Sequence, residues 1–281
     1  MTDIFDDRAC ELGEGPFWHP ERQQLFWFDI LGNRMLSRGP DGQVSWEMGE
    51  NASAAGWIDR ERLLIATENG LFRFDLATGS RTLLVSLEAD TPETRSNDGR
   101  ADPMGGFWIG TMGKAAQPRA GAIYRYFDGK LERLFPEITI PNAICFAPDG
   151  RRAYYADTPR QRIWTVALDA QGWPAAASEV FADLRGEAKY PDGAVVDAQG
   201  ALWVAQWGAG RVVRYLRDGR VDRVIDLPAR NLTCPCFGGA ELDKMFVTSA
   251  WVGLKDRAAT DGQTFALDPG CTGLPVPRVQ I

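Results

Sequence analysis

The chain has 281 residues, a formal net charge of −7 and an isoelectric point near 4.9. This acidity argues against nucleic acid or an anionic membrane as the main partner. With 30 Gly, 17 Pro and 10 Trp, the composition favours many short strands joined by turns over long helices.

The N-terminal stretch, residues 1–7, is acidic and lacks the basic, apolar and small-residue regions of a signal peptide. No apolar run approaches the roughly 20 residues that span a bilayer. The five scattered cysteines are expected to be reduced thiols, and Cys234-Pro235-Cys236 lacks the second pair or nearby His of a zinc site. We therefore expect a cytoplasmic protein.

A short unit recurs about six times along the chain. It consists of a polar side chain, an apolar strand, a turn and a second apolar strand, and it is clearest at residues 190–204. There Asp192 precedes Gly200 by eight positions, and Asn97 and Asn142 each precede a glycine by the same interval. Weaker copies complete a series of polar positions, which consists of Glu14, Ser53, Asn97, Asn142, Asp192 and Thr233.

The six positions are separated by 39, 44, 45, 50 and 41 residues, within the roughly 40–50-residue range of four-stranded propeller blades. Second strands are predicted at residues 25–28, 63–66, 107–110, 153–156, 202–205 and 245–248. Third strands are clearest at 70–74, 122–126, 162–166 and 212–215, and no segment keeps a helical period over three turns. We predict an all-β, six-bladed β-propeller in a single domain, residues 1–281. One or two β-sandwiches, the competing fold, would show unequal spacing. Residues 8–11 and 276–279 are candidates for adjacent strands that close the ring.

The first strand of each blade lines the central channel of a propeller, so the six polar residues are predicted to ring one end of it. Oxygen donors without clustered His or Cys suit a hard divalent cation such as Ca²⁺, Mg²⁺ or Mn²⁺. Glu14 and Asp192 would offset its charge, and Asn142 would add an amide oxygen. A water-filled polar channel without a ligand is the alternative.

A metal with open coordination positions would activate a carbonyl and a water molecule, and Asp192 would serve as a general base or hold the water. A Ser-His triad is disfavoured, because His19 is the one histidine and is expected to pack at a strand end. Arg95 shares a face with Asn97 and would hold substrate oxygens, unless it is a solvated loop arginine. Asp98 points the other way and is expected to stabilise the turn.

Several motifs, in this order and spacing, resemble those of the regucalcin and gluconolactonase (senescence marker protein-like) family of sugar-acid lactonases. The resemblance runs nearly end to end. The motifs are Leu12-Gly13-Glu14-Gly15-Pro16, Arg95-Ser96-Asn97-Asp98-Gly99, Gly110-Thr111-Met112, Pro141-Asn142, Pro191-Asp192-Gly193 and Cys236-Phe237-Gly238-Gly239.

The resemblance implies a six-bladed propeller with one divalent metal in its axial channel, which hydrolyses lactones of aldonic acids. It implies that Glu14, Asn142 and Asp192 are the metal ligands and that Asp192 also donates or accepts a proton. Arg95 and Asn97 would contact the substrate. The candidate metals are Ca²⁺, Zn²⁺, Mn²⁺, Mg²⁺ and Fe²⁺.

Some members of that family also use a Glu from the loop that follows Gly-Thr-Met. Here this loop, residues 113–120, contains no acidic residue, and Gln117 or Arg119 is the candidate for its place in substrate binding.

We therefore expect a metal-dependent hydrolase of a five- or six-carbon sugar lactone, such as glucono-, xylono-, arabinono- or galactonolactone. Two alternatives stay open: a phosphotriesterase or arylesterase on the same scaffold, and a non-catalytic metal- or sugar-binding propeller. The expected partner is a small molecule, and the oligomeric state is left open.

Overall fold

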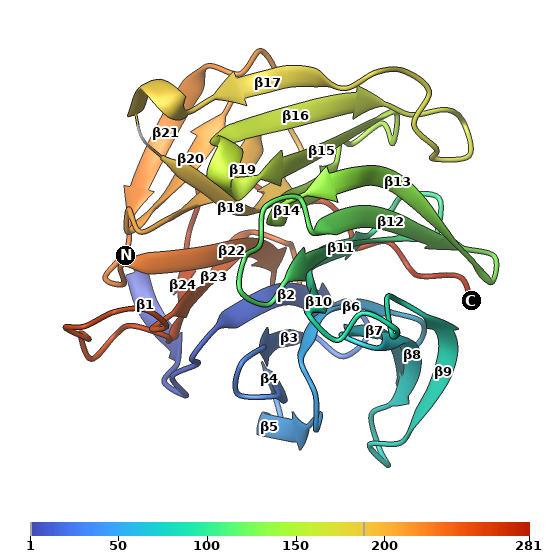
Figure 1. The fold of residues 1–281 in the computed structure, drawn as a ribbon. Helices are drawn as coiled ribbons and strands as arrows, with labels where there is room; N and C mark the ends of the chain where they lie inside the picture. Colours follow the sequence, from blue (N-terminus) through green and yellow to red (C-terminus); the bar gives the residue numbers. More distant parts are fainter. Residues whose placement is uncertain (1, 188) are drawn as a thin grey trace.

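The computed structural model describes residues 2–187 and 189–281, which form six four-stranded antiparallel sheets arranged as blades around a central axis (Figure 1). The predicted six-bladed β-propeller is confirmed.

From the axis outward, the first three blades consist of β2 (Gly13–His19), β3 (Gln24–Asp29), β4 (Arg34–Gly39) and β5 (Gly42–Glu47); β6 (Ala52–Trp57), β7 (Arg62–Thr67), β8 (Gly70–Asp75) and β9 (Arg81–Ser86); and β10 (Thr94–Ala101), β11 (Phe107–Gly113), β12 (Gly121–Phe127) and β13 (Lys130–Ile138). The other three consist of β14 (Pro141–Phe146), β15 (Arg152–Asp157), β16 (Arg162–Ala167) and β17 (Glu179–Asp183); β18 (Tyr190–Val196), β19 (Leu202–Trp207), β20 (Arg211–Tyr215) and β21 (Val221–Asp226); and β22 (Asn231–Gly238), β23 (Lys244–Ala250), β24 (Thr264–Leu267) and β1 (Thr2–Asp6). Two short 3₁₀ turns are η1 (Thr158–Arg160) and η2 (Arg185–Glu187).

Burial falls from the inner to the outer strands of a blade. Every residue of β2 and β3 is buried, whereas no residue of β5 is. The second strands are apolar runs because neighbouring blades cover both of their faces, and they carry the fully buried Trp27, Trp108 and Trp203. His19 is also fully buried and packs beside Phe26, as expected for a packing residue. None of the helical segments among the described residues is long and apolar enough to cross a membrane.

Two buried aspartates, each directly after an inner strand, tie that strand to the third strand of the same blade. Asp102 accepts hydrogen bonds from the backbone N of Gly106 (3.0 Å) and from Nε of Arg125 (2.7 Å). Asp197 accepts the equivalent bond from Nε of Arg214 (2.8 Å). A slip of one residue would turn every side chain of a strand to the opposite face, so these contacts help to keep the polar side chains of the inner strands in place.

The ring is closed by β1, which pairs antiparallel with β24 as the outermost strand of the last blade. The prediction that residues 8–11 and 276–279 form adjacent strands that close the ring was wrong. Residues 8–11 connect β1 to β2, and the backbone N of Val279 donates to the carbonyl oxygen of Trp57 in the second blade (2.9 Å). The physical reason is that the C-terminal part of the chain supplies only three strands of the last blade, so the N-terminal strand β1 adds the fourth and joins the two ends of the ring.

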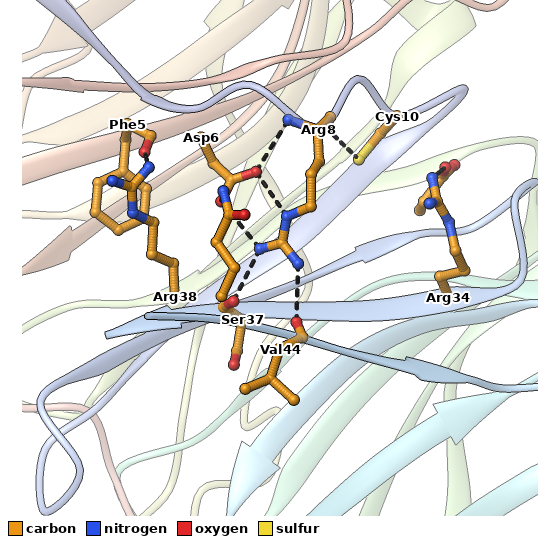
Figure 2. A network of polar contacts seen from close by, with 10 residues as sticks. Phe5, Asp6, Arg8, Cys10, Arg34, Ser37, Arg38 and Val44 are labelled. Atoms are coloured by element: carbon orange, nitrogen blue, oxygen red, sulfur yellow. Dashed lines mark hydrogen bonds and ion pairs between the residues drawn. The ribbon is translucent and has the colours of Figure 1, made fainter. Parts of the chain in front are cut away.

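Arg8 fastens this last blade to the first one (Figure 2). Its Nε donates to Oδ1 of the fully buried Asp6 (2.9 Å). Its terminal nitrogens donate to the backbone oxygens of Ser37 (2.8 Å) and Val44 (2.9 Å), which belong to β4 and β5. One guanidinium therefore bridges three strands at the seam of the ring.

Candidate active site

Each of the six inner strands has an irregular register at its predicted polar residue. The shifts span Glu14 to Phe17, Ala52 to Ala54, Ser96 to Gly99, Asn142 to Cys145, Pro191 to Ala194 and Leu232 to Pro235. A β-bulge bends its strand and re-aims a side chain. Gly15 contributes to the first bulge with a φ of 57°, and a Cβ there would meet the carbonyl oxygen of Ser53. The repeated unit of the sequence thus corresponds to a repeated local distortion at the axis.

Four of the six polar residues reach one cavity, namely Glu14, Asn97, Asn142 and Asp192. The two hydroxyl residues do not, which corrects the expectation of a six-membered ring. Their short side chains bond the neighbouring inner strands instead. Oγ of Ser53 donates to the carbonyl oxygen of Asn97 (2.6 Å), and Oγ1 of Thr233 donates to that of Gly13 (2.6 Å).

The cavity has a volume of about 570 Å³, which lies in the usual range for small-molecule sites. The four polar residues are only 2–5% exposed, so they form its buried end. Tyr190 is 43% exposed and the side chain of Lys114 is 40% exposed, so these two residues lie at the mouth. The walls between are largely apolar and include Leu12, Leu31, Met112, Ile140, Trp207 and Val252.

Hydrogen bonds orient the two carboxamides at the buried end. Nδ2 of Asn142 donates to Oγ1 of Thr158 (2.8 Å), and that hydroxyl donates to the carbonyl oxygen of Pro191 (2.8 Å). The Asn142 amide is therefore held with its nitrogen on Thr158, and its Oδ1 accepts a long bond from Nδ2 of Asn97 (3.2 Å). Nη1 of Arg95 donates to Oδ1 of Asn97 (2.9 Å). Thr158 was not among the predicted site residues, although its place directly after β15, the partner strand of β14, was a usable signal.

Two carboxylates share this buried end and repel each other. Burial raises the pKa of Glu14 to about 8, with the negative charge of Asp98 as the next cause. Burial also raises the pKa of Asp192 well above its usual value, and the charges of Glu14 and Asp98 add to the effect. The nearby Arg95 opposes both shifts, but the effect of its charge is smaller than that of burial and of the neighbouring carboxylates. The buried end therefore favours a proton or another cation.

Asp98 lies in the same region but has a different role from the turn contact that was predicted. Its Oδ2 accepts a hydrogen bond from the backbone N of Ile144 in the next inner strand (2.7 Å), while Oδ1 has no hydrogen-bond partner among the described residues. Burial raises its pKa to about 6. Asp98 therefore links two blades and adds negative potential beneath Glu14 and Asp192.

The donor set fits a hard divalent cation. Carboxylate and amide oxygens are the ligands that such ions prefer, and two buried carboxylates supply the two charges that offset a dication. Within the described part of the chain there is no group of three or more His, Cys, Asp or Glu side chains placed to hold a metal. The expected set is of a different kind, because it combines two carboxylates with the amide oxygen of Asn142.

Two residues proposed for substrate binding lie outside the cavity lining. Oε1 of Gln117 accepts a hydrogen bond from the backbone N of Ala115 (3.1 Å), and Arg119 forms an exposed ion pair with Glu137. The loop turns through positive φ angles at Ala116 (52°) and Arg119 (59°), and Ala116 still lines the cavity. A role for either side chain in substrate binding stays a prediction that would require the loop to move. Lys114, which follows the Gly-Thr-Met-Gly segment and was missed, lines the cavity instead.

Residues 12–251 match the protein-family model described as the SMP-30/gluconolactonase/LRE-like region. The L-arabinolactonase of Azospirillum brasilense is 39% identical, with 92% of this chain and 87% of that protein covered. A pentonolactonase of Haloferax volcanii is 32% identical, with 96% and 94% covered.

Among solved structures, the calcium-binding protein regucalcin from Agrobacterium tumefaciens str. C58 is 40% identical and superimposes with a TM-score of 0.96, covering 100% of this chain and 98% of that one. The family model alone spans well over half of the sequence, and the solved relative has the same fold. The chain belongs to the SMP-30/gluconolactonase/LRE-like family.

Proposed function

We propose that this protein hydrolyses the lactone of a five- or six-carbon sugar acid to the open-chain acid, with one divalent cation as cofactor. The observation that carries the proposal is the convergence of Glu14, Asn142 and Asp192 at the buried end of one cavity. Two relatives of similar length are named as lactonases of pentose acids, which supports the substrate class. The calcium-binding relative supports a divalent cation without deciding which one.

Glu14, Asn142 and Asp192 are the residues that would hold the cation. When bound, such an ion supplies a positive charge that polarises an ester carbonyl and acidifies water. The pKa shifts of the two carboxyl groups favour this role, since a cation would stabilise the ionised forms that burial and nearby negative charges now disfavour. Thr158 supports the set by fixing the amide of Asn142.

Asp192 is proposed as the group that moves the proton. Its carboxylate would accept a proton from the attacking water as the water oxygen bonds to the lactone carbonyl carbon. The ring C–O bond then breaks, and the same carboxyl group returns the proton to the leaving ring oxygen, so that the product is a hydroxy acid. Asp192 is buried in the lining of the cavity, which places its carboxyl group for both transfers.

Arg95 and Asn97 are proposed to orient the substrate. Nη1 of Arg95 is bonded to Oδ1 of Asn97 and to the carbonyl oxygen of Ser96 (2.8 Å), which fixes the plane of the guanidinium at the cavity wall. A fixed guanidinium binds hydroxyl or carboxylate oxygens with little loss of side-chain entropy. The apolar walls would exclude bulk water and so strengthen these polar contacts.

The test is a rate measurement on gluconolactone, xylonolactone, arabinonolactone and galactonolactone, each corrected for spontaneous hydrolysis. We expect turnover of at least one lactone that is abolished by a chelator and restored by a divalent cation. Asp192→Asn should lower kcat by at least about a hundredfold, whereas the control Asp218→Asn, at an exposed surface ion pair, should leave kcat unchanged.

Two results would refute the proposal in distinct ways. Turnover of an organophosphate or aryl ester far above that of every lactone would indicate the phosphotriesterase or arylesterase alternative. Tight metal binding without acceleration of any ester would indicate a binding protein.

A further inference from the structure

We propose that Lys114 is a specificity-determining residue and that it selects lactones carrying a carboxylate or another anion at the end of the exocyclic carbon chain. This inference rests on the proposed lactone hydrolysis, because that reaction places the ester at the buried end of the cavity. It concerns the loop between β11 and β12.

The shape of the cavity places Lys114 opposite the ester. The oxygen donors of Glu14, Asn142 and Asp192 are 2–5% exposed, whereas the side chain of Lys114 is 40% exposed and lines the same cavity. In the proposed pose the lactone carbonyl lies at the buried end, and the exocyclic carbons extend from the alkoxy carbon of the ester toward the mouth. The ammonium group is therefore positioned to meet the far end of the substrate.

Backbone and side-chain contacts fix Lys114 in this position. Its backbone N donates to the carbonyl oxygen of Glu93 (2.8 Å), and its Nζ forms an ion pair with Oε2 of Glu68. Oε1 of Glu68 accepts a hydrogen bond from the backbone N of Asn51 (3.1 Å), so the partner carboxylate is itself held by the second blade. The ammonium is thus preorganised at the mouth, which limits the entropy lost when a ligand binds.

The balance of charges in the cavity favours an anion at this end. The lining contains two carboxylates, Glu14 and Asp192, and two cations, Arg95 and Lys114. Both carboxylates lie in the set proposed to hold a divalent cation, so the lining charges left to meet the substrate are those of Arg95 and of Lys114, which Glu68 pairs from outside the lining. Largely apolar walls surround them and weaken the screening by water. A lactone of a dicarboxylic sugar acid would present an anion to Lys114, while a simple aldonolactone presents a neutral hydroxyl.

A purely structural role is the competing explanation, because the pair of Lys114 and Glu68 also ties the loop to the second blade. The two explanations differ in the effect of replacing each partner. If the pair only holds the loop, Lys114→Gln and Glu68→Gln break the same contact and act in the same direction. If Lys114 binds an anion, Glu68 competes with that anion, and the two substitutions act in opposite directions.

The experiment compares kcat/KM for gluconolactone and for glucarolactone, in which a carboxylate replaces the terminal hydroxymethyl group. We expect Lys114→Gln to lower the ratio of glucarolactone to gluconolactone activity about fivefold, the factor for one partly exposed charge contact. Glu68→Gln should raise this ratio. In both variants the change should lie in KM for glucarolactone rather than in kcat. Lys130→Gln, at an exposed hairpin turn outside the cavity, is the matched control and should leave the ratio unchanged.

Calorimetric titration with glucarate, the dicarboxylate itself, gives a second measurement that does not need turnover. Its affinity should fall about fivefold in Lys114→Gln. Equal changes of the ratio in both variants, or an unchanged ratio in Lys114→Gln, would overturn the inference. If the wild-type protein hydrolyses no lactone but glucarate binding still depends on Lys114, the anion site is supported and the proposed hydrolysis fails.

Discussion

Replacing Glu14 by Gln should stabilise the metal-free protein at pH 8, because it removes a buried charge and keeps the shape of the side chain. Burial raises the pKa of Glu14 from 4.5 to about 8 in the folded protein, while the exposed group of the unfolded chain keeps its ordinary value. One pKa unit corresponds to about 1.4 kcal/mol, so the ionised group at pH 8 costs the folded state on the order of 4 kcal/mol. The amide oxygen of Gln can still accept the bond that the backbone N of Gly15 now donates to Glu14 (3.1 Å).

The sign of the pH dependence follows from the raised pKa. Below about pH 4.5 Glu14 is protonated in both states, so its pKa shift leaves stability unchanged. Between that pH and about 8 the unfolded chain releases the proton while the folded protein retains it, so the free energy of unfolding falls as pH rises. The advantage of Glu14→Gln in stability should therefore be small near pH 4.5 and greatest near pH 8.

Urea unfolding at pH 5 and pH 8 in the presence of a chelator measures how the stability of each protein depends on pH. The same titration with excess Ca²⁺ or Mn²⁺ measures how much the cation stabilises each protein. The cation should stabilise the wild-type protein by about 2.7 kcal/mol at a hundred times its Kd, and Glu14→Gln should lose most of this gain. Glu61→Gln, at an exposed surface position, is the control. A variant less stable than the wild type at pH 8 in chelator, or one that gains as much from the cation, would refute the reasoning.

Two further substitutions test the seam of the ring and the support of the metal ligands. Arg8→Ala should lower the free energy of unfolding by about 3 kcal/mol, because it leaves the fully buried carboxylate of Asp6 without its ion pair; denaturant titration measures this. The control is Arg185→Ala, which removes an exposed ion pair with Asp183. It should change the free energy of unfolding by less than about 1 kcal/mol. Thr158→Val should weaken cation binding about tenfold without unfolding the protein, because the hydroxyl orients the amide of Asn142. Unchanged affinity in a calorimetric titration would contradict that role.

The repeat in the sequence was sufficient to predict the blades and the residues at the axis. Inner and second strands are buried on both faces, so they appear as apolar runs at a blade's spacing. The polar residue that begins each run marks a bulge, and Asn142 and Asp192 were found in this way. These features are local, because each depends on residues within one blade of about 40–50 positions.

Contacts between distant segments decided what the sequence analysis left open or predicted incorrectly. The ring closes by pairing Thr2–Asp6 with Thr264–Leu267, and an exposed edge strand carries no local signal of its partner. Ser53 and Thr233 match the repeat, but their side chains are too short to reach the cavity and bond neighbouring strands instead. Lys114, rather than Gln117 or Arg119, lines the cavity because the backbone of its loop turns. Sequence alone thus determined which residues face the axis, whereas three-dimensional packing determined which of them share a site.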